Sequence, residues 1–289
     1  MKARELKKFA SFALIPLTIF VFVLLIPFIQ GLFLTFTNYD GFKFDKFVAF
    51  DNYIQSFQDE KFWSTLWFTF SFVMVSIVAV NVVGFGLALL VTVKMKGANF
   101  LRTLFFVPNL IGGVILGVIW QFIFEKALTG VATNLKWADW LQTSFLADPG
   151  TAFWALIIVT TWQMSGYLMI IYVTGIMSIE NDVLEAARID GASPLRTLIS
   201  IKMPLMAQAF TISLFLSLRS AFMAYDVNLA LTNGGPYGST ELISMHIYKE
   251  AFYNAHFATG QAKAVIMFLI IALAALTQVA ISKRMEVQR

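Results

Sequence analysis

Hydrophobic residues are gathered into long stretches along this chain, and polar residues separate the stretches. An α-helix needs about 20 apolar residues to cross the hydrocarbon core of a membrane, so stretches of this length predict membrane-spanning helices. The stretches lie at residues 11–34, 63–93, 104–124, 152–177, 204–225 and 262–282. This pattern predicts an all-α integral membrane protein with six transmembrane helices, whose termini lie on the same side.

Lys and Arg are distributed unevenly between these stretches. With the N-terminus inside, 13 of them fall in inner segments and 6 in outer segments, while Arg219 and Lys263 lie within the stretches. Positively charged flanks stay in the cytoplasm during insertion. We therefore expect a multi-pass protein of the cell (inner) membrane with both termini in the cytoplasm. The inner residues are Lys2, Arg4, Lys7, Lys8, Lys94, Lys96, Arg102, Arg188, Arg196, Lys202, Lys283, Arg284 and Arg289, and the outer residues are Lys43, Lys46, Lys61, Lys126, Lys136 and Lys249.

This orientation assigns each segment of the chain to a side of the membrane. The first helix is expected to be a retained anchor, because it is longer than the roughly 7–15-residue core of a signal peptide and no small-x-small cleavage site precedes Tyr39. The expected segments are a cytoplasmic N-tail at 1–10, a first transmembrane helix at 11–34, an extracytoplasmic segment at 35–62, a transmembrane core at 63–282 with a cytoplasmic loop at 178–205, and a cytoplasmic C-tail at 283–289.

Composition supports lipid as the solvent and excludes several kinds of chemistry. Charged residues make up 13% of the chain, compared with about 25% in soluble domains. The net charge of +4 is accounted for by cytoplasmic anchoring residues, so no nucleic-acid partner is expected. The absence of cysteine excludes disulfides and thiolate sites. No G-x-x-x-x-G-K-[ST] loop occurs, so this chain is not expected to bind and hydrolyse ATP itself.

Few ionisable residues approach the predicted spans, where such residues mark ion or proton pathways. Asp226 and Lys263 lie near the outer ends and either sit at the interface or extend to it. Arg219 is deeper, about two helical turns before Asp226, and either leans towards that residue or faces a wet cavity. His246 and His256 lack the i, i+4 spacing of a helical metal pair, so we expect structural roles and no bound metal.

Gly and Pro mark positions where the predicted helices bend or pack closely. Gly113 and Gly117 form a small-xxx-small pair, for which packing between helices is favoured over a hinge role. The other residues of this kind within the spans are Pro16, Pro27, Gly84, Gly86, Pro108 and Gly112.

The polar loop at 178–205 carries clear helix punctuation. Asp182 followed by Glu185 is typical of a capping box, Gly191 can end that helix, and Ser193 before Pro194 can begin another. Two short helices joined by a tight turn are expected. Small residues beside charges would let a partner surface approach the first helix closely. A solvated amphipathic connector is the alternative, and periodicity alone does not decide between the two.

The residues of this loop resemble a known motif. Glu185-Ala186-Ala187, the following Asp190-Gly191 and the terminal Pro204 resemble the EAA loop of binding-protein-dependent ABC importer permeases. Segments 47–63, 100–108 and 231–236 resemble the carbohydrate-uptake branch, specifically its MalF/UgpA-like subunits. The sequence departs from the maltose-type member in lacking its extra N-terminal helices and large periplasmic insertion, so the resemblance implies the sugar class and not maltose in particular.

The resemblance implies a type I ABC importer permease fold with a MetI-like core. It implies that the EAA loop docks on a cytosolic ATPase through Glu185, Ala186, Ala187, Asp190, Gly191 and Pro204. The implied partners are a second, non-identical permease subunit that is MalG-like, two copies of a cytosolic ABC ATPase, an extracytoplasmic sugar-binding protein, the sugar and membrane lipid. ATP and Mg²⁺ would be bound by the partner ATPase, and this chain would bind no cofactor.

Two predicted spans carry polar stripes that could line a solute pathway. Thr160, Gln163, Tyr167 and Thr174 share one helix face, and the resemblance implies that these two helices hold the sugar, with Tyr167 at a contacting position. Hydrogen bonding between helices, at about 1 kcal/mol each, is the alternative. The second stripe includes Ser213. The expected pathway residues are Tyr167, Gln163, Thr160, Met164, Ser217, Ser220, Ala221, Ala224 and Asn228, with Trp162 as a further candidate.

These observations predict a permease subunit of an ATP-driven sugar importer that forms half of the translocation pathway. One alternative is an ABC permease for a non-sugar solute such as glycerol phosphate. Another is an ion-coupled secondary transporter, which would need buried carboxylates or a broken-helix ion site. A membrane enzyme would need a polar catalytic cluster, and the sequence offers none.

Overall fold

The computed structural model describes residues 2–93, 96–135 and 143–283. The predicted C-tail beyond Lys283 and the basic residues Lys94, Lys136, Arg284 and Arg289 therefore lie outside the described residues. The described residues are almost entirely helical, with one isolated bridge between Thr37 and Phe47. The expected all-α class is confirmed.

Among the described residues, five helices are long and apolar enough to cross a membrane, and a sixth span results if one bent pair counts as a single span. The five are Ser11–Leu34, Glu60–Thr92, Gly113–Asn134, Pro149–Met177 and Phe257–Lys283, and the bent pair is Pro194–Leu205 with Ala207–Phe222. Four of the six predicted stretches fall within or close to these bounds. The third and fifth differ in a way that the backbone explains.

The predicted third span at 104–124 is wrong in its position. Helix α5 (Ala98–Phe106) and a 3₁₀ turn, η2 (Val107–Leu110), end at Ile111, and α6 (Gly113–Phe122) then begins a separate helix. Ile111 and Gly112 are extended, with ψ angles of 127° and 140°. Pro108 lacks the N–H that would continue the α-helical ladder, so the helix breaks inside an apolar stretch. The π-helix η3 (Ile123–Ala127) and α7 (Leu128–Leu135) continue α6.

The predicted fifth span at 204–225 corresponds mainly to one helix, and the backbone bends sharply at its start. Helix α10 (Pro194–Thr197), the π-helix η5 (Leu198–Lys202) and α11 (Met203–Leu205) form one arm, and α12 (Ala207–Phe222) forms the other. The helix axis bends by 73° between the two arms. Met206, with φ −104° and ψ 19°, leaves the helical region between them. A short helix, α13 (Asp226–Leu231), follows α12.

The chain divides into two compact units, Met1–Trp63 with His246–Phe268, and Ser64–Met245 with Leu269–Arg289. The segment 246–268, expected within a single core at 63–282, thus groups with the N-terminal segment. In the first unit α1 (Lys2–Phe20), the π-helix η1 (Val21–Leu25) and α2 (Ile26–Leu34) run on without a break, followed by α3 (Asp51–Gln58). The end of α14 (Ile243–Tyr248), the π-helix η6 (Lys249–Tyr253) and the start of α15 (Phe257–Lys283) complete the unit.

Asn52 ties α3 to the end of α2 in the first unit. Its side chain is 6% exposed, and Nδ2 donates to the carbonyl oxygens of Thr35 at 2.7 Å and Thr37 at 2.8 Å. Both carbonyls lie just past the helix end, where backbone acceptors lack partners in the helix. This amide therefore replaces the missing helical hydrogen bonds and fixes the turn into α3.

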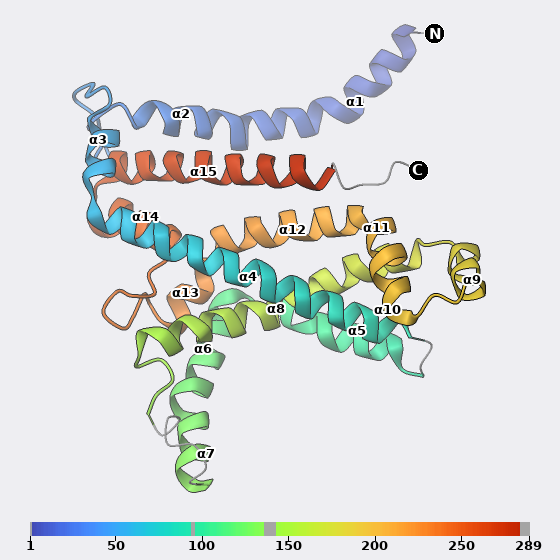
Figure 1. Cartoon of the computed structure of the whole chain (residues 1–289). Helices are drawn as coiled ribbons and strands as arrows, with labels where there is room; N and C mark the ends of the chain where they lie inside the picture. Colours follow the sequence, from blue (N-terminus) through green and yellow to red (C-terminus); the bar gives the residue numbers. More distant parts are fainter. Residues whose placement is uncertain (1, 94–95, 136–142, 284–289) are drawn as a thin grey trace. The chain divides into compact units, whose positions relative to one another are not determined.

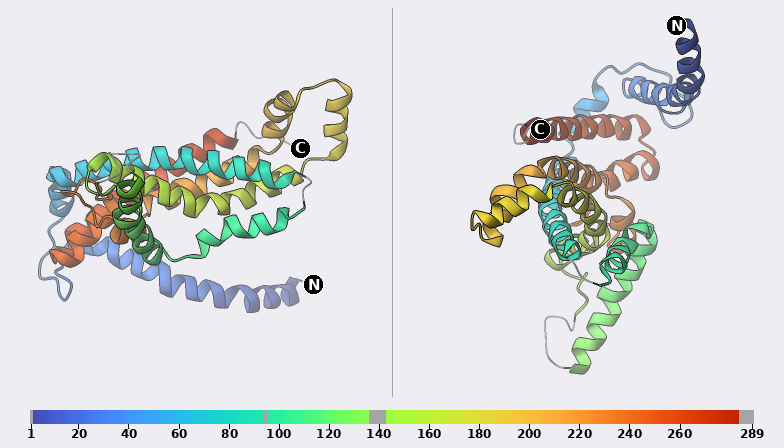
Figure 2. Two further views of the ribbon diagram at one scale, coloured as in Figure 1. Left: turned by 90° about the horizontal axis from the view of Figure 1, so that it is seen from below. Right: turned by 90° about the vertical axis from the view of Figure 1, so that its right-hand side faces the viewer.

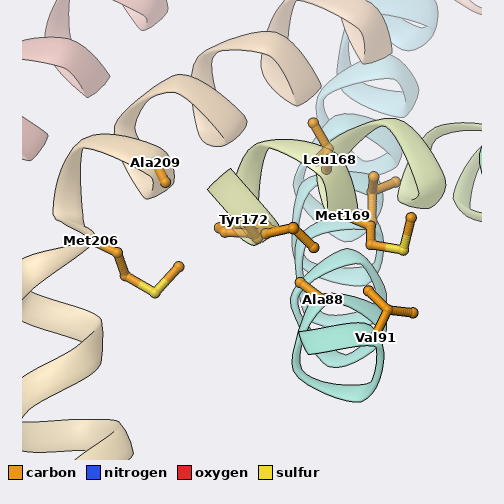
Figure 3. Close-up of a cluster of buried hydrophobic side chains, with 9 residues drawn as sticks. Ala88, Val91, Leu168, Met169, Tyr172, Met206 and Ala209 are labelled. Carbon is orange, nitrogen blue, oxygen red and sulfur yellow. The ribbon is translucent and has the colours of Figure 1, made fainter. Parts of the chain in front are cut away.

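The core of the second unit lies between α4 (Glu60–Thr92), α8 (Pro149–Met177) and α12. Figure 3 shows Ala88 and Val91 of α4 and Leu168, Met169 and Tyr172 of α8 in one cluster with residues at the start of α12. The phenol of Tyr172 donates to Asn81 Oδ1 at 2.6 Å. These contacts hold the three helices together along their length.

Close backbone approach fixes α6 against α13. A Cβ added at Gly117 would lie 2.5 Å from Ala230 Cβ and 3.1 Å from the backbone nitrogen of Leu231. A Cβ added at Gly113 would lie 2.7 Å from Asp226 Cβ. The packing role expected for this small-xxx-small pair is confirmed, because both glycines sit where a larger side chain would separate the helices.

Candidate coupling loop and solute cavities

The loop at 178–205 extends away from the helices of its unit. Figures 1 and 2 show α9 (Asn181–Ile189) projecting beyond the ends of α8 and α12. The second helical element begins at Pro194, so the two short helices that the sequence predicts are confirmed. The loop runs from the end of α8 to the bend at Met206 that precedes α12.

The start of α9 differs from the capping box expected at Asp182 and Glu185. The helix begins at Asn181, and its N-cap, Glu180, makes no side-chain capping hydrogen bond. Asp182 therefore lies inside the first turn. Its carboxylate can favour the helix N-terminus only through the helix dipole, because the N-cap position is already taken by Glu180.

The turn between the two short helices follows the expected punctuation. Gly191 has φ +72°, which favours glycine, and the N–H of Ala192 donates to the Ala187 carbonyl at 3.0 Å. This six-to-one bond is the Schellman arrangement at a helix C-terminus. The hydroxyl of Ser193 accepts from the Arg196 N–H at 3.3 Å and caps the next helix. The turn is thus locally determined.

The two alanines of the EAA segment face different ways. Ala187 is 5% exposed, whereas Glu185 and Ala186 are exposed. Two large apolar side chains are also exposed on this loop, Ile189 at 86% and Leu195 at 66%. A solvated connector has no need of exposed Ile and Leu, so these side chains favour a contact surface. Asp190 is exposed at the C-cap of α9.

The polar residues of α8 line two different cavities. The first, which we call the loop-side cavity, has a volume of about 660 Å³ and lies between the C-terminal half of α8 and the bend at Met206. Its lining includes Tyr167 and Thr174 together with both ends of the loop. The lining residues are Tyr167, Ile171, Thr174, Gly175, Ser178, Pro204, Leu205, Met206, Ala207, Gln208, Ala209, Ile212 and Leu216.

The second cavity, which we call the α13-side cavity, has a volume of about 300 Å³. It lies further along the same two helices, between the middle of α8 and the end of α12. Gln163 Nε2 donates to the Ile111 carbonyl at 3.1 Å and so anchors this wall to the break before α6. The lining residues are Gly113, Thr160, Gln163, Met164, Arg219, Ser220, Met223, Ala224, Tyr225, Asp226 and Val227.

The structure brings six of the nine expected pathway residues to these cavities. Tyr167 lines the loop-side cavity, and Thr160, Gln163, Met164, Ser220 and Ala224 line the α13-side cavity. Met164 and Ser220 also touch each other, since the Ser220 hydroxyl donates to Met164 Sδ at 3.5 Å. Ser217, Ala221 and Asn228 line neither cavity.

Hydrogen bonding within the protein occupies two of the three residues outside the cavities. Ser217 is 4% exposed and accepts from Asn81 Nδ2 at 2.9 Å. Asn228 is fully buried, and its amide donates to the carbonyl of Thr240 at 2.8 Å and accepts from the N–H of Leu242 at 3.2 Å. Ala221 is 2% exposed. The alternative of packing between helices describes these positions.

Arg219 and Asp226 both line the α13-side cavity. Both side chains are exposed, and among the described residues no hydrogen bond or ion pair of either side chain is found. Of the two roles expected for Arg219, the wet cavity is the one that the structure supports. A sequence signal for their place in the α13-side cavity was available, because Arg219 and Asp226 lie seven residues apart at the end of a polar stripe.

The side chain of Lys263 is buried, so it does not extend out of the protein to reach water. It is 2% exposed, and its Nζ lies 2.6 Å from Asp59 Oδ2, 3.5 Å from Glu250 Oε2 and 3.2 Å from His246 Nε2. A buried ammonium needs such partners because an isolated charge is costly to remove from water. No local pattern could predict this cluster, because Asp59 lies 204 residues away from Lys263.

The carboxylates of this cluster respond to their neighbours. Burial alone would raise the pKa of Asp59, but the hydrogen bond and the charge of Lys263 outweigh it and the pKa is lowered. Burial would likewise raise the pKa of Glu250, and the hydrogen bond from His256 with the charge of Lys263 lowers it instead. His256 Nδ1 lies 2.9 Å from Glu250 Oε1. Both histidines thus belong to one ion cluster.

The apolar helices, the exposed loop and the two cavities along one helix pair suit a transport subunit. Residues 81–287 match the family model described as "Binding-protein-dependent transport system inner membrane component". The chain belongs to this family. The matched region contains the loop and both cavities.

Similar proteins are known from bacteria. The chain is 45% identical over 271 residues to a probable starch degradation products transport system permease protein, AmyD, of Thermoanaerobacterium thermosulfurigenes, covering 93% of this chain and 91% of that one. It is 33% identical to the multiple sugar-binding transport system permease protein MsmF of Streptococcus mutans, with 96% of each chain covered. A bacterial alginate ABC transporter shares the fold, with a TM-score of 0.84 at 21% identity over 98% of this chain and 96% of that one. The expected importer permease fold is confirmed.

Proposed function

We propose that this chain is the permease subunit of an ATP-driven importer for a sugar and forms half of its translocation pathway. The names of AmyD and MsmF support a saccharide as the solute. The glycerol phosphate alternative rests on lower similarity, since the permease UgpA is 29% identical. A second, MalG-like permease subunit would form the other half, and an extracytoplasmic binding protein would deliver the sugar.

The coupling role is supported by the fact that both ends of the loop line the loop-side cavity. Ser178 ends α8 where the loop begins, Pro204 lies where the loop ends, and both line that cavity. A displacement of α9 would therefore reach this cavity at both ends of the loop. Alternating access needs this kind of linkage between a driven element and the solute path.

The exposed surface that α9 and the start of α10 form suits docking on a cytosolic ATPase. Glu185 and Ala186 would lie against the ATPase with Ile189 and Leu195, so that apolar contact supplies affinity and the carboxylate fixes orientation. ATP and Mg²⁺ would be bound by that partner, and this chain would contribute conformational work only. This docking requires the loop and both termini to lie in the cytoplasm, as the distribution of Lys and Arg predicts.

Reversing one charge on the loop tests the proposal. In proteoliposomes that contain the complete importer, Glu185→Lys is expected to abolish the stimulation of ATP hydrolysis by the sugar-loaded binding protein. Glu60→Lys makes the same change at an exposed carboxylate at the start of α4 and is expected to retain it. Unchanged stimulation with Glu185→Lys in an assembled complex contradicts the coupling role.

A further inference from the structure

Opposite charges face the same small cavity. Arg219 lies in the last turn of α12 and Asp226 is the first residue of α13, and both line the α13-side cavity of about 300 Å³. We propose that Arg219 and Asp226 are specificity-determining residues that admit a neutral polyhydroxylated solute to this cavity and exclude an anionic one. This inference deepens the proposed function, because it names the charge class of the sugar.

Each charge has hydrogen-bonding capacity to offer a solute. Their side chains are exposed, and no ion pair within 4.0 Å joins them in the part of the chain that the structure describes. Ionisable residues at membrane depth are costly and are placed where they contact a pathway or a partner. Arg219 and Asp226 line one cavity without pairing, so both side chains are free to form hydrogen bonds with a bound solute.

Gly113 fixes the position of the carboxylate. A Cβ at Gly113 would lie 2.7 Å from Asp226 Cβ and 3.5 Å from its Oδ2, so α6 packs directly against this side chain. Such an approach leaves the Asp226 side chain little freedom to move towards α6. Gly113 is therefore a positioning residue for the carboxylate, and Asp226 keeps its place in the cavity wall.

The chemistry of the two groups matches sugar hydroxyls. A hydroxyl both donates and accepts, whereas a guanidinium only donates and a carboxylate only accepts. One solute with several hydroxyls can satisfy both, and hydrogen bonds to charged groups are the stronger kind. The rest of the wall supplies uncharged polar groups from Thr160 and Gln163 and apolar surface from Val227, which suit the hydroxyls and the C–H faces of a sugar ring.

An anionic solute meets opposing effects in the same cavity. Attraction to Arg219 is offset by repulsion from Asp226, and the solute must still lose its own hydration on entering. A neutral saccharide avoids that loss of ionic hydration. The pair of charges therefore selects against uronates and phosphates while it retains binding of neutral sugars.

The natural absence of cysteine from this chain permits a direct test. Ala224→Cys places a single thiol on the cavity wall. In proteoliposomes of the complete importer, its rates of reaction with an anionic sulfonatoethyl and a neutral hydroxyethyl methanethiosulfonate are compared. Their ratio is informative because a change in thiol reactivity affects both reagents alike. The same measurements are made with Asp226→Asn or Arg219→Gln added.

The ratio of the anionic to the neutral reaction rate is expected to rise about threefold or more with Asp226→Asn and to fall by a similar factor with Arg219→Gln. The reason is that charges lining the same small cavity as the thiol are weakly screened by salt. Asp45→Asn removes an exposed carboxylate of the other unit and should leave the ratio unchanged. A ratio that responds to neither cavity charge overturns the proposal.

Protection by sugars separates this inference from the proposed function. Maltotriose is expected to slow the neutral reagent, and a trisaccharide with a terminal uronate is expected to have no effect. Equal protection by both overturns the selection against anions. Charge-sensitive rates without protection by maltotriose support the selection by charge and count against the proposed sugar class.

Discussion

The ammonium of Lys263 lies 2.6 Å from Asp59 Oδ2, and the two residues come from segments 204 residues apart. The lysine side chain is 2% exposed and the aspartate side chain is 27% exposed. The ion pair therefore joins the start of α15 to the turn between α3 and α4 within the first unit. Because one partner is nearly inaccessible to water, loss of the other has a larger effect than at a surface ion pair.

Lys263→Met is expected to destabilise the protein by about 2 kcal/mol, less than the roughly 3–5 kcal/mol of a fully buried pair, because Asp59 keeps some contact with water. The measurement is the thermal unfolding midpoint of the purified complex in detergent. Lys43→Met breaks an exposed pair with Asp45 and should leave the midpoint nearly unchanged. Adding Asp59→Asn to Lys263→Met should recover part of the loss, and a fully additive loss contradicts the pairing.

Stability is expected to fall in acid because of the same cluster. The pKa values of Asp59 and Glu250 are lowered in the folded protein. Each therefore contributes stability that is present above its unfolded pKa, about 4, and is lost as the pH falls through the lower, folded pKa. Midpoints measured between about pH 3 and pH 7 should show this loss in the natural protein, and Lys263→Met should reduce the slope. An identical slope in both proteins would mean that other carboxylates control it.

Gly117→Ala is expected to destabilise the packing of α6 on α13. The added Cβ would lie 2.5 Å from Ala230 Cβ, so the helices must separate, at a cost of about 1–3 kcal/mol. Gly130→Ala in α7 is the matched control, since nothing lies within 4 Å of its added Cβ. The control should be neutral or slightly stabilising. Equal midpoints for the two variants would show that α6 and α13 are not packed closely.

Tyr167→Ala is expected to lower sugar uptake by the complete importer while binding-protein-stimulated ATP hydrolysis continues. The phenol lines the loop-side cavity but takes no part in the exposed surface of α9. Tyr237→Ala removes the same side chain from a position that is 98% exposed and should leave uptake intact. Unchanged uptake with Tyr167→Ala removes this residue from the solute path.

The sequence predicted those features of the fold that depend on residues close together in the chain. The apolar stretches marked the spans, and Gly191 and Ser193 marked the turn between the short helices, because caps and turns depend on neighbouring residues. Pro108 and Gly112 marked a place where the third span could bend, but the full break after Leu110 was not predicted, and neither was the bend at Met206, at the start of the predicted fifth span. Hydropathy measures solvent preference and does not detect a backbone that leaves the helix within it.

The candidate site was predictable only in part for a related reason. The periodicity of α8 placed Gln163 and Tyr167 on one face, but it could not show that they line different cavities. Helical spacing likewise could not separate Ser220, which lines a cavity, from Ser217, which bonds to Asn81 on another helix. These distinctions depend on contacts between helices that are distant in the sequence.

Transmission from the loop to the loop-side cavity can be measured directly with one thiol. Thr174→Cys lines that cavity, and its rate of modification by a neutral methanethiosulfonate is recorded in the complete importer with and without ATP. The rate should change on ATP binding, and the added Glu185→Lys should eliminate that change. Two results would contradict the coupling of loop and cavity. One is a modification rate that changes equally with ATP whether or not Glu185→Lys is present, and the other is a rate that does not change with ATP when Glu185 is retained.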